Sequence, residues 1–291
     1  MAAYTLDLKQ DAKWLRHARI TPSWQHQEQS RHNRRFGSSK LGHNTELVDV
    51  LGLNADLETP IGKHELRYGA DLSRDEVRSS AWNENILTGA RSYRTTRYPN
   101  GGSTMSSLAA YVNHSIEFSP KFVLTEGLRL TSVQLSATFN DQEDFRFLNG
   151  TWKQDNTALT WRVGAAYMPG RDWRFSVLTS SGFRAPNVDD IGKVFDSAQG
   201  DVIVPNPDLG PERTANFEAS ASKTFAEQAT IEVNGFYTLY TNAITVGPYT
   251  LNGADSIDYD GVLSRVAALR NTSEAYLYGG SAQFTGHFND R

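Results

Sequence analysis

The residues most suited to ligand chemistry lie in the segment 82–103, WNENILTGARSYRTTRYPNGGS, which mixes arginines with aromatic side chains. Six of its residues are candidates for ligand contact: Trp82, Arg91, Tyr93, Arg94, Arg97 and Tyr98. Guanidinium groups beside aromatic rings suit an anionic, planar ligand, because they combine bidentate hydrogen bonding with cation–π stacking. Simple solvation of these arginines in an exposed loop is the alternative interpretation.

Two histidines, His32 and His43, lie in or beside the segment 32–44 and are weak candidates for a haem ligand, a role that needs a His or Tyr side chain. Exposure of each histidine to solvent, without a ligand, is the alternative. Four other histidines fall within expected strands and lack metal-ligand spacing: His17, His26, His64 and His114. We therefore predict no metal site and no resident cofactor.

Catalytic motifs are missing from the sequence. Neither G-x-S-x-G nor H-E-x-x-H occurs, and the adjacent His114 and Ser115 would point to opposite faces of a strand. The acidic stretches 141–144 and 254–260 lack the spacing of a calcium loop, which favours solvated loop charge. A chain without cysteine has no thiolate site, and a net charge of −4 gives no polycationic surface for nucleic acid. We predict a protein that is not an enzyme and binds no nucleic acid.

The elements that must position these side chains are β-strands. Apolar residues occupy every second position in 108–118, 159–167 and 229–240, which is the pattern of a half-buried strand. Helical periodicity is absent, and no apolar run approaches the roughly 18–20 residues of a membrane-spanning helix. The predicted strands are 2–9, 13–31, 45–57, 64–81, 104–118, 122–140, 157–168, 172–184, 213–225, 229–245 and 272–288. The fold class is therefore all-β.

The connections between these strands alternate between short and long. The short ones lie near 10–12, 59–64, 119–121, 169–171 and 226–228, and the long ones span 32–44, 82–103, 141–156, 185–212 and 246–271. Antiparallel up-and-down transmembrane β-barrels show this alternation, with short periplasmic turns and long extracellular loops. Five aromatic residues beside the short turns fit an interfacial girdle: Phe118, Phe122, Tyr167, Trp173 and Phe225. A soluble all-β protein such as a lectin or a propeller is the alternative.

Two motifs bracket the connection that follows residue 184. Phe183-Arg184-Ala185-Pro186 ends one predicted strand, and Asn206-Pro207-Asp208-Leu209-Gly210-Pro211-Glu212 opens the next. Together and in this order they resemble the signature region of TonB-dependent outer-membrane receptors. GLRL at 127–130 and NGFYTLYTNAI at 234–244 are similar to further strands of these barrels. The segments KVFDS and VIVPNPDL are similar to receptors of the Bacteroidetes group.

Elementary chemistry gives these motifs a structural role. Their prolines fix φ and remove backbone donors, so the sheet ladder must stop and restart there. Arg184 and Glu212 lie at the two strand–loop junctions and are predicted to form an ion pair that holds the base of the loop. We interpret nine motif residues as structural rather than ligand-binding: Phe183, Arg184, Ala185, Pro186, Asn206, Pro207, Leu209, Pro211 and Glu212.

The resemblance implies a barrel of about 22 strands that is filled by a plug domain. We count about 11 strands and find no plug and no terminal strand ending in an aromatic residue. We therefore expect residues 1–291 to form one domain, a partial barrel of about half the full size, belonging to a longer gene product. Such a piece should not transport by itself, because unpaired strand edges are not tolerated in lipid.

The function implied by the resemblance is import of a scarce, large nutrient across the outer membrane of a Gram-negative cell, foremost a ferric siderophore or another iron complex. Haem or cobalamin is the alternative within the family, and a soluble all-β protein that binds a ligand or a glycan is the alternative from another class. Haem receptors of the family often carry a histidine between the two motifs, and 187–205 contains none. The implied partners are the ligand, the TonB–ExbB–ExbD complex acting through the missing plug segment, and outer-membrane lipid and lipopolysaccharide. Bridging of lipopolysaccharide phosphates is an alternative to ligand contact for the arginines of 82–103.

Overall fold

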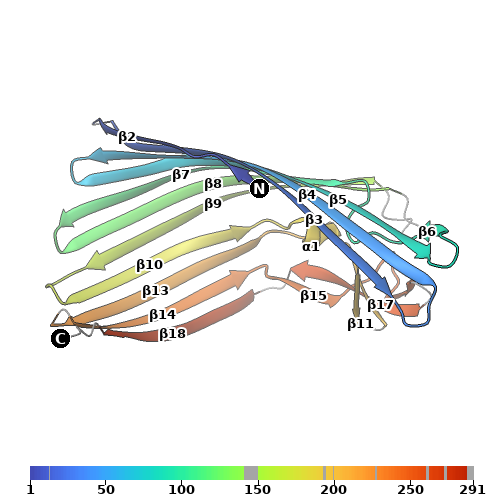
Figure 1. Ribbon diagram of the computed structural model, residues 1–291. Coiled ribbons are helices and arrows are strands. Elements are labelled where there is room, and N and C mark those ends of the chain that lie inside the picture. The colour runs from blue at the N-terminus through green and yellow to red at the C-terminus, as the bar shows by residue number, and fades with distance from the viewer. Residues whose placement is uncertain are drawn as a thin grey trace, which may run out of the picture.

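The computed structural model describes residues 1–12, 14–140, 150–192, 195–198, 200–226, 228–259, 262–271 and 274–286. It is almost entirely β-structure and contains one short helix, α1 (Val188–Gly192). A large sheet of 13 strands forms a curved wall, and a five-stranded sheet lies on the concave side of that wall at one end (Figure 1). No helix among these residues has the length and apolar character that crossing a membrane requires. The all-β fold class is therefore confirmed.

The large sheet is built from long antiparallel strands joined mostly as hairpins. Its strands are β1 (Ala2–Ala3), β2 (Leu6–Ala12), β3 (Leu15–Arg34), β4 (Lys40–Ile61), β5 (His64–Asn85), β6 (Arg91–Tyr93), β7 (Ser103–Ser119), β8 (Phe122–Phe139), β9 (Gly150–Tyr167), β10 (Trp173–Arg184), β13 (Glu212–Phe225), β14 (Ala229–Thr241) and β18 (Glu274–Gly286). Each of the 11 predicted strands has a counterpart here, the first being split between β1 and β2. The alternation of apolar residues located these strands because it is a local property of each strand.

Three predicted long connections overlap strands of the large sheet, and one of them, 82–103, includes the end of β5 and all of β6. Strand β9 begins at Gly150, although the prediction assigned 141–156 to a long connection. Strands β3 and β4 leave only residues 35–39 between them, although the prediction placed a long connection over 32–44. These errors all fall at the long-loop end. There the strands continue beyond their apolar part, so the alternation of apolar and polar residues no longer marks them. The acidic stretch 141–144 lies outside the described residues.

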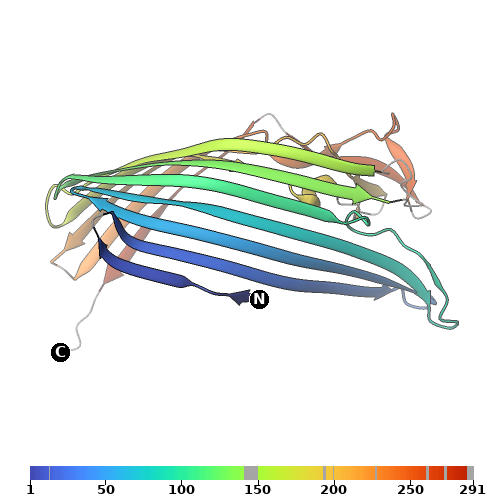
Figure 2. The ribbon, with the colours of Figure 1, turned by 90° about the horizontal axis from the view of Figure 1, so that it is seen from above.

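The large sheet is an open wall. Its strand order runs from β1 and β3 to β14 and β18, and nothing within the described residues pairs β18 back to the first strands. Viewed from above, the strands lie side by side with the short turns together at one end (Figure 2). We call this the short-turn end and the opposite one the long-loop end.

The second sheet corrects the prediction that 185–212 and 246–271 are loops. It contains β11 (Phe195–Ala198), β12 (Asp201–Val204), β15 (Ile244–Pro248), β16 (Ser256–Tyr259) and β17 (Val262–Asn271). Strand β12 pairs with β17 in parallel, from Asp201↔Arg265 to Val204↔Ala268. These short strands depend on a surface to pack against, which the large sheet supplies.

The two faces of β8 exchange character along the strand. We call the face that carries α1 and the small sheet the inner face, and the opposite one the outer face. Near the short turns the outer face is apolar, and Leu128 and Leu130 are half exposed on it. Towards the long-loop end the inner face becomes apolar instead, with Leu135, Ala137 and Phe139 at most 3% exposed.

Two buried clusters attach the long-loop segments to the inner face. In one, Leu135 and Ala137 pack against Val188 and Ile191 of α1 and against Leu209. In the other, Phe139 packs against β12 and β17, through buried Val202, Val204, Val266 and Ala268. Burial of these side chains holds α1 and the small sheet on the wall.

The outer face carries a continuous apolar belt. It is bounded at the short-turn end by the five predicted aromatic residues, of which Phe118 and Phe122 contact each other at 5.9 Å between ring centroids. Lys223 Nζ lies 4.8 Å from the ring centroid of Trp173, in the same region. Transmembrane β-barrels carry such an apolar band with aromatic residues at its border, so the outer face has the pattern expected of a barrel wall.

Candidate functional site

The candidate site lies on the inner face at the long-loop end. Here the segment Arg94–Pro99, which we call the strap, runs from β6 to β7 across the inner face, and α1 packs beside it. Pro99 is fully buried, and the Cβ that Gly192 lacks would meet its ring at 2.9 Å. A glycine at 192 therefore allows α1 to approach the strap.

Arg94 fixes the start of the strap to three strands. Its Nε donates to Asn44 Oδ1 at 2.9 Å, its Nη1 to Asn83 Oδ1 at 3.2 Å and its Nη2 to Asn33 Oδ1 at 3.2 Å. The guanidinium lies against Gly42, where a Cβ would meet Nη1 at 2.3 Å. These hydrogen bonds engage three of the five guanidinium N–H groups and tie the strap to β3, β4 and β5.

Arg97 and Tyr98 connect the strap to α1. Tyr98 donates from its hydroxyl to Asp189 Oδ1 at 2.8 Å, and Arg97 Nη2 lies 3.9 Å from the same oxygen. Burial, together with the hydrogen bond to Asp189, raises the pKa of Tyr98 to about 12, so the hydroxyl remains a donor. The Arg97 guanidinium stacks over the Tyr98 ring at 5.4 Å and remains one-quarter exposed.

Polar groups lie buried on the same part of the inner face. Glu46 of β4 is 3% exposed, and Ser79 of β5 stands directly opposite it in the register. Neither oxygen of the Glu46 carboxylate has a hydrogen-bond partner among the described residues, and the same is true of the Ser79 and Ser103 hydroxyls and of Arg97 Nε. Arg31 Nη2 lies 3.9 Å from Glu46 Oε1. Buried polar groups without hydrogen bonds destabilise the arrangement that holds them.

The predicted ion pair between Arg184 and Glu212 is present. The two residues are direct partners in the β10–β13 register, and Arg184 Nε donates to Glu212. Arg184 also donates to Asp190 Oδ2 at 2.6 Å, and Glu212 accepts from the Ile244 amide at 2.7 Å. Burial opposes ionisation of Glu212, but these hydrogen bonds outweigh it and lower the pKa of that carboxyl.

The second motif is anchored to the small sheet. Asn206 is buried and donates to the Leu269 carbonyl at 2.8 Å, while its Oδ1 accepts from the Asp208 amide at 3.1 Å. Leu209 belongs to the cluster with α1, and Pro186 of the first motif is also buried. These contacts support the structural interpretation of the motif residues.

The other candidates of segment 82–103 lie on the outer face. Trp82 stands opposite both His43 and Tyr93 in the register, and its ring stacks on His43 with 5.0 Å between centroids. Cζ of Arg91 lies over the Trp82 ring, 5.1 Å from its centroid. His32 stands opposite His43. The six candidates therefore do not form one site: Arg94, Arg97 and Tyr98 lie on the inner face, and Trp82, Arg91 and Tyr93 on the outer face.

Sequence reasoning missed the residues that connect these segments. Asp189 and Asp190 of α1 bond Tyr98 and Arg184, and three asparagines hold Arg94. A signal was available for α1, because Asn187 and Asp190 form a reciprocal cap in which Asn187 Oδ1 accepts from the Asp190 amide at 3.0 Å. The asparagines carried no such signal, since their positions become neighbours only through the strand register.

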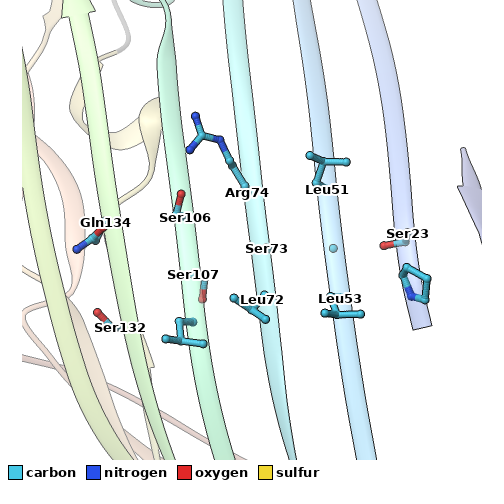
Figure 3. A pocket seen from close by; sticks show the side chains of 13 residues that line it. Ser23, Leu51, Leu53, Leu72, Ser73, Arg74, Ser106, Ser107, Ser132 and Gln134 are labelled. Atoms are coloured by element: carbon cyan, nitrogen blue, oxygen red, sulfur yellow. The ribbon is translucent and has the colours of Figure 1, made fainter. Parts of the chain in front are cut away.

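A hollow of about 520 Å³ lies on the outer face where the apolar belt ends (Figure 3). Leu51, Leu53 and Leu72 line one part of it, and Ser106 and Ser132 line another, with Arg74 extending above. Its place on the outside of the wall separates it from the strap and α1. Among the described residues, no group of three or more His, Cys, Asp or Glu side chains is placed to hold a metal ion.

Solved structures of similar fold include transporters and receptors. The copper transporter OprC superposes with a TM-score of 0.77 at 11% identity, over 99% of this chain and 44% of that chain. The Serratia marcescens hemophore receptor HasR, solved as a double mutant with its hemophore HasA and heme, gives 0.70 at 15% identity, over 97% and 45%. The ferric yersiniabactin uptake receptor FyuA from Yersinia pestis gives 0.62 at 17% identity, over 99% and 39%.

The chain thus spans less than half the length of these solved structures. No curated protein sequence matches it. The family model for the TonB dependent receptor-like β-barrel matches residues 1–290, which is nearly the whole chain. The protein belongs to the TonB-dependent receptor β-barrel family.

Proposed function

We propose that this chain forms about half of the barrel wall of an outer-membrane receptor, which imports a ferric siderophore or a similar iron complex. The observation that carries the proposal is the outer apolar belt opposite an inner face rich in ion pairs. Arg67 Nε, for example, lies 2.8 Å from Glu65 Oε1 and 3.6 Å from Glu58 Oε2. A wall that is apolar outside and charged inside separates lipid from a hydrated lumen.

The proportions of the chain support the partial-barrel proposal. It covers 39–45% of three receptor chains that superpose on it, and both outer edges of its large sheet lack a closing partner within the described residues. The remaining strands and a plug domain would complete the lumen. Energy coupling through TonB, ExbB and ExbD would act on that plug.

The inner face at the long-loop end supports an anionic ligand. Arg97 is the strap arginine that keeps an exposed part, its Nε has no hydrogen-bond partner in the described part of the chain, and it lies against the Tyr98 ring. A guanidinium stacked on an aromatic ring binds planar anions such as a ferric catecholate. Haem is the second candidate ligand, because the similar structures include a hemophore receptor solved with heme.

A growth experiment with the complete gene tests the proposed function. Cells that lack their own iron receptors should grow on iron-depleted medium only when they express the gene and receive one class of ferric siderophore. Growth on haem alone would transfer the proposal to haem, and growth on neither, with the protein folded in the outer membrane, would refute iron uptake. Arg97→Gln should weaken uptake, whereas Arg213→Gln, which changes an arginine in the wall strand β13, should not.

A further inference from the structure

The outer face holds a pair of histidines whose geometry the proposed transport does not use. His32 and His43 are direct partners in the β3–β4 register, beside the turn 35–39. Their Nδ1 atoms lie 2.9 Å apart, with the ring planes at 69° and the ring centroids 4.8 Å apart. Two imidazole nitrogens therefore lie side by side near the long-loop end.

The surroundings of His43 favour the tautomer that leaves its Nδ1 free to accept or to ligate. Its Nε2 is buried without a hydrogen-bond partner among the described residues, and Glu84 Oε2 lies 3.5 Å from it. A carboxylate on this side favours a proton on Nε2, so the lone pair of the neutral ring is on Nδ1. Metal-binding histidines are commonly oriented by a carboxylate on the second nitrogen in this way.

Stacking holds the His43 ring in place. Trp82 lies parallel to it, at 6° between planes and 5.0 Å between centroids, and the guanidinium of Arg91 in β6 lies over the Trp82 ring. His43 is mostly buried by these neighbours, whereas His32 is exposed. The pair thus combines one fixed nitrogen with one that is open to solvent.

We propose that His32 and His43 bind a divalent transition metal, with Cu²⁺ preferred, and that water fills the remaining positions. Nitrogens that occupy adjacent positions of a tetragonal ion at about 2.0 Å lie about 2.8 Å apart, and tetrahedral Zn²⁺ separates them by about 3.3 Å. The observed 2.9 Å matches the tetragonal arrangement. Cu²⁺ also binds imidazole more tightly than Ni²⁺ or Zn²⁺ does.

Metal binding requires a change of tautomer at His32. In the metal-free pair one Nδ1 donates a hydrogen bond to the other, so one proton lies between them. Cu²⁺ takes the Nδ1 lone pair of both rings, so His32 gives up its Nδ1 proton to solvent and takes one from solvent on Nε2, and both rings remain neutral. Because the pair lies on the outer face, this metal site is separate from the strap and α1 and does not depend on the ligand that is transported.

The test measures Cu²⁺ binding to the detergent-solubilised protein made from its complete gene and purified without a histidine tag. His32→Gln should remove one bound Cu²⁺ or weaken its binding at least tenfold, and Glu84→Gln should weaken it about tenfold. His26→Gln is the matched control, because His26 lies in the same strand but pairs with Asp49 at 2.7 Å. The control should bind Cu²⁺ as the wild type does.

Two spectroscopic signals locate the metal. Cu²⁺ should quench the emission that Trp82→Phe removes, and its electron paramagnetic resonance spectrum should show two imidazole nitrogens. His32→Gln should lose both signals. Because His32 is exposed, this substitution should disturb folding least, and a heat-modifiable gel shift checks that the variant is folded. Equal Cu²⁺ stoichiometry and affinity in wild type and folded His32→Gln would overturn the proposal, leaving a hydrogen bond only.

Discussion

Tyr98 and Asp189 are 91 residues apart in sequence and share a hydrogen bond of 2.8 Å. This contact joins the arginine-rich segment that follows β6 to the helix that follows the first signature motif. Asp190, the next residue, bonds Arg184, which pairs with Glu212 at the second motif. Two segments that the sequence presents separately therefore form one connected structure on the inner face.

Tyr98→Phe tests this connection. Removal of the hydroxyl leaves Asp189 without one donor and should destabilise the strap and α1 by about 1 kcal/mol. Amide hydrogen exchange should become faster in 94–99 and 188–192 and remain unchanged in β4. Tyr278→Phe, at an exposed position of β18, is the control. Unchanged exchange in the strap would show that the hydrogen bond does not hold the two segments together.

Glu212→Gln should have a pH-dependent effect on the base of the loop. The folded-state pKa of Glu212 lies below its ordinary value of 4.5, so its ionised form adds stability above that pH and loses it as the pH falls. The variant should therefore be about 1–2 kcal/mol less stable at pH 7 and approach the wild type in acid. Proteolysis of 185–211 as a function of pH reports the difference. Asp208→Asn, at an exposed position, should show no such pH dependence.

Glu46→Met should stabilise the protein. The substitution replaces a buried carboxylate, which accepts no hydrogen bond from any described residue, by an apolar side chain of similar length, with a gain of about 1–3 kcal/mol. Denaturant unfolding measures the free energy of unfolding of each variant. Glu28→Met, at an exposed position, should change this free energy by less than about 0.5 kcal/mol. A loss of stability in Glu46→Met would mean that the carboxylate is bound by a group that the strap brings to it.

Leu128→Arg and Gln134→Arg separate the two parts of β8. Both positions face outward, but Leu128 lies within the apolar belt and Gln134 beyond it. An arginine in the belt should cost about 2–4 kcal/mol near the bilayer midplane and reduce assembly into the outer membrane, whereas Gln134→Arg should assemble normally. The folded fraction on a heat-modifiability gel is the measurement. Equal assembly of the two variants would place the belt outside lipid.

The strands could be predicted from the sequence because side-chain alternation is local. LAAYVNHSIEF at 108–118 shows by itself which residues share a face. The ion pair of Arg184 and Glu212 was predictable for a related reason, since the two motifs end and begin neighbouring strands.

The small sheet and the candidate site depend on contacts between distant segments, so the sequence did not predict them. Val202 and Val266 are ordinary strand residues until Phe139 of β8 supplies the surface that buries them. The stacking of His43 on Trp82 requires the β4–β5 register, which the short turn at 62–63 sets. Predicting that Arg91 lies on the outer face and that Arg94 and Arg97 lie on the inner face would also have required the path of the strap.

The central proposal is that the chain forms part of a membrane wall, in which the two faces of β8 exchange character along the strand. The direct test uses the outer-membrane protein made from its complete gene, with a single nitroxide label at each position from Leu128 to Phe139 in turn. The accessibility of each label to oxygen and to a water-soluble nickel complex is measured. We predict high oxygen accessibility at 128 and 130, nickel accessibility at 134 and 136, and protection from both at 135 and 137. Uniform nickel accessibility at 128, 130, 134 and 136 would contradict the account, because it would place the apolar belt in water.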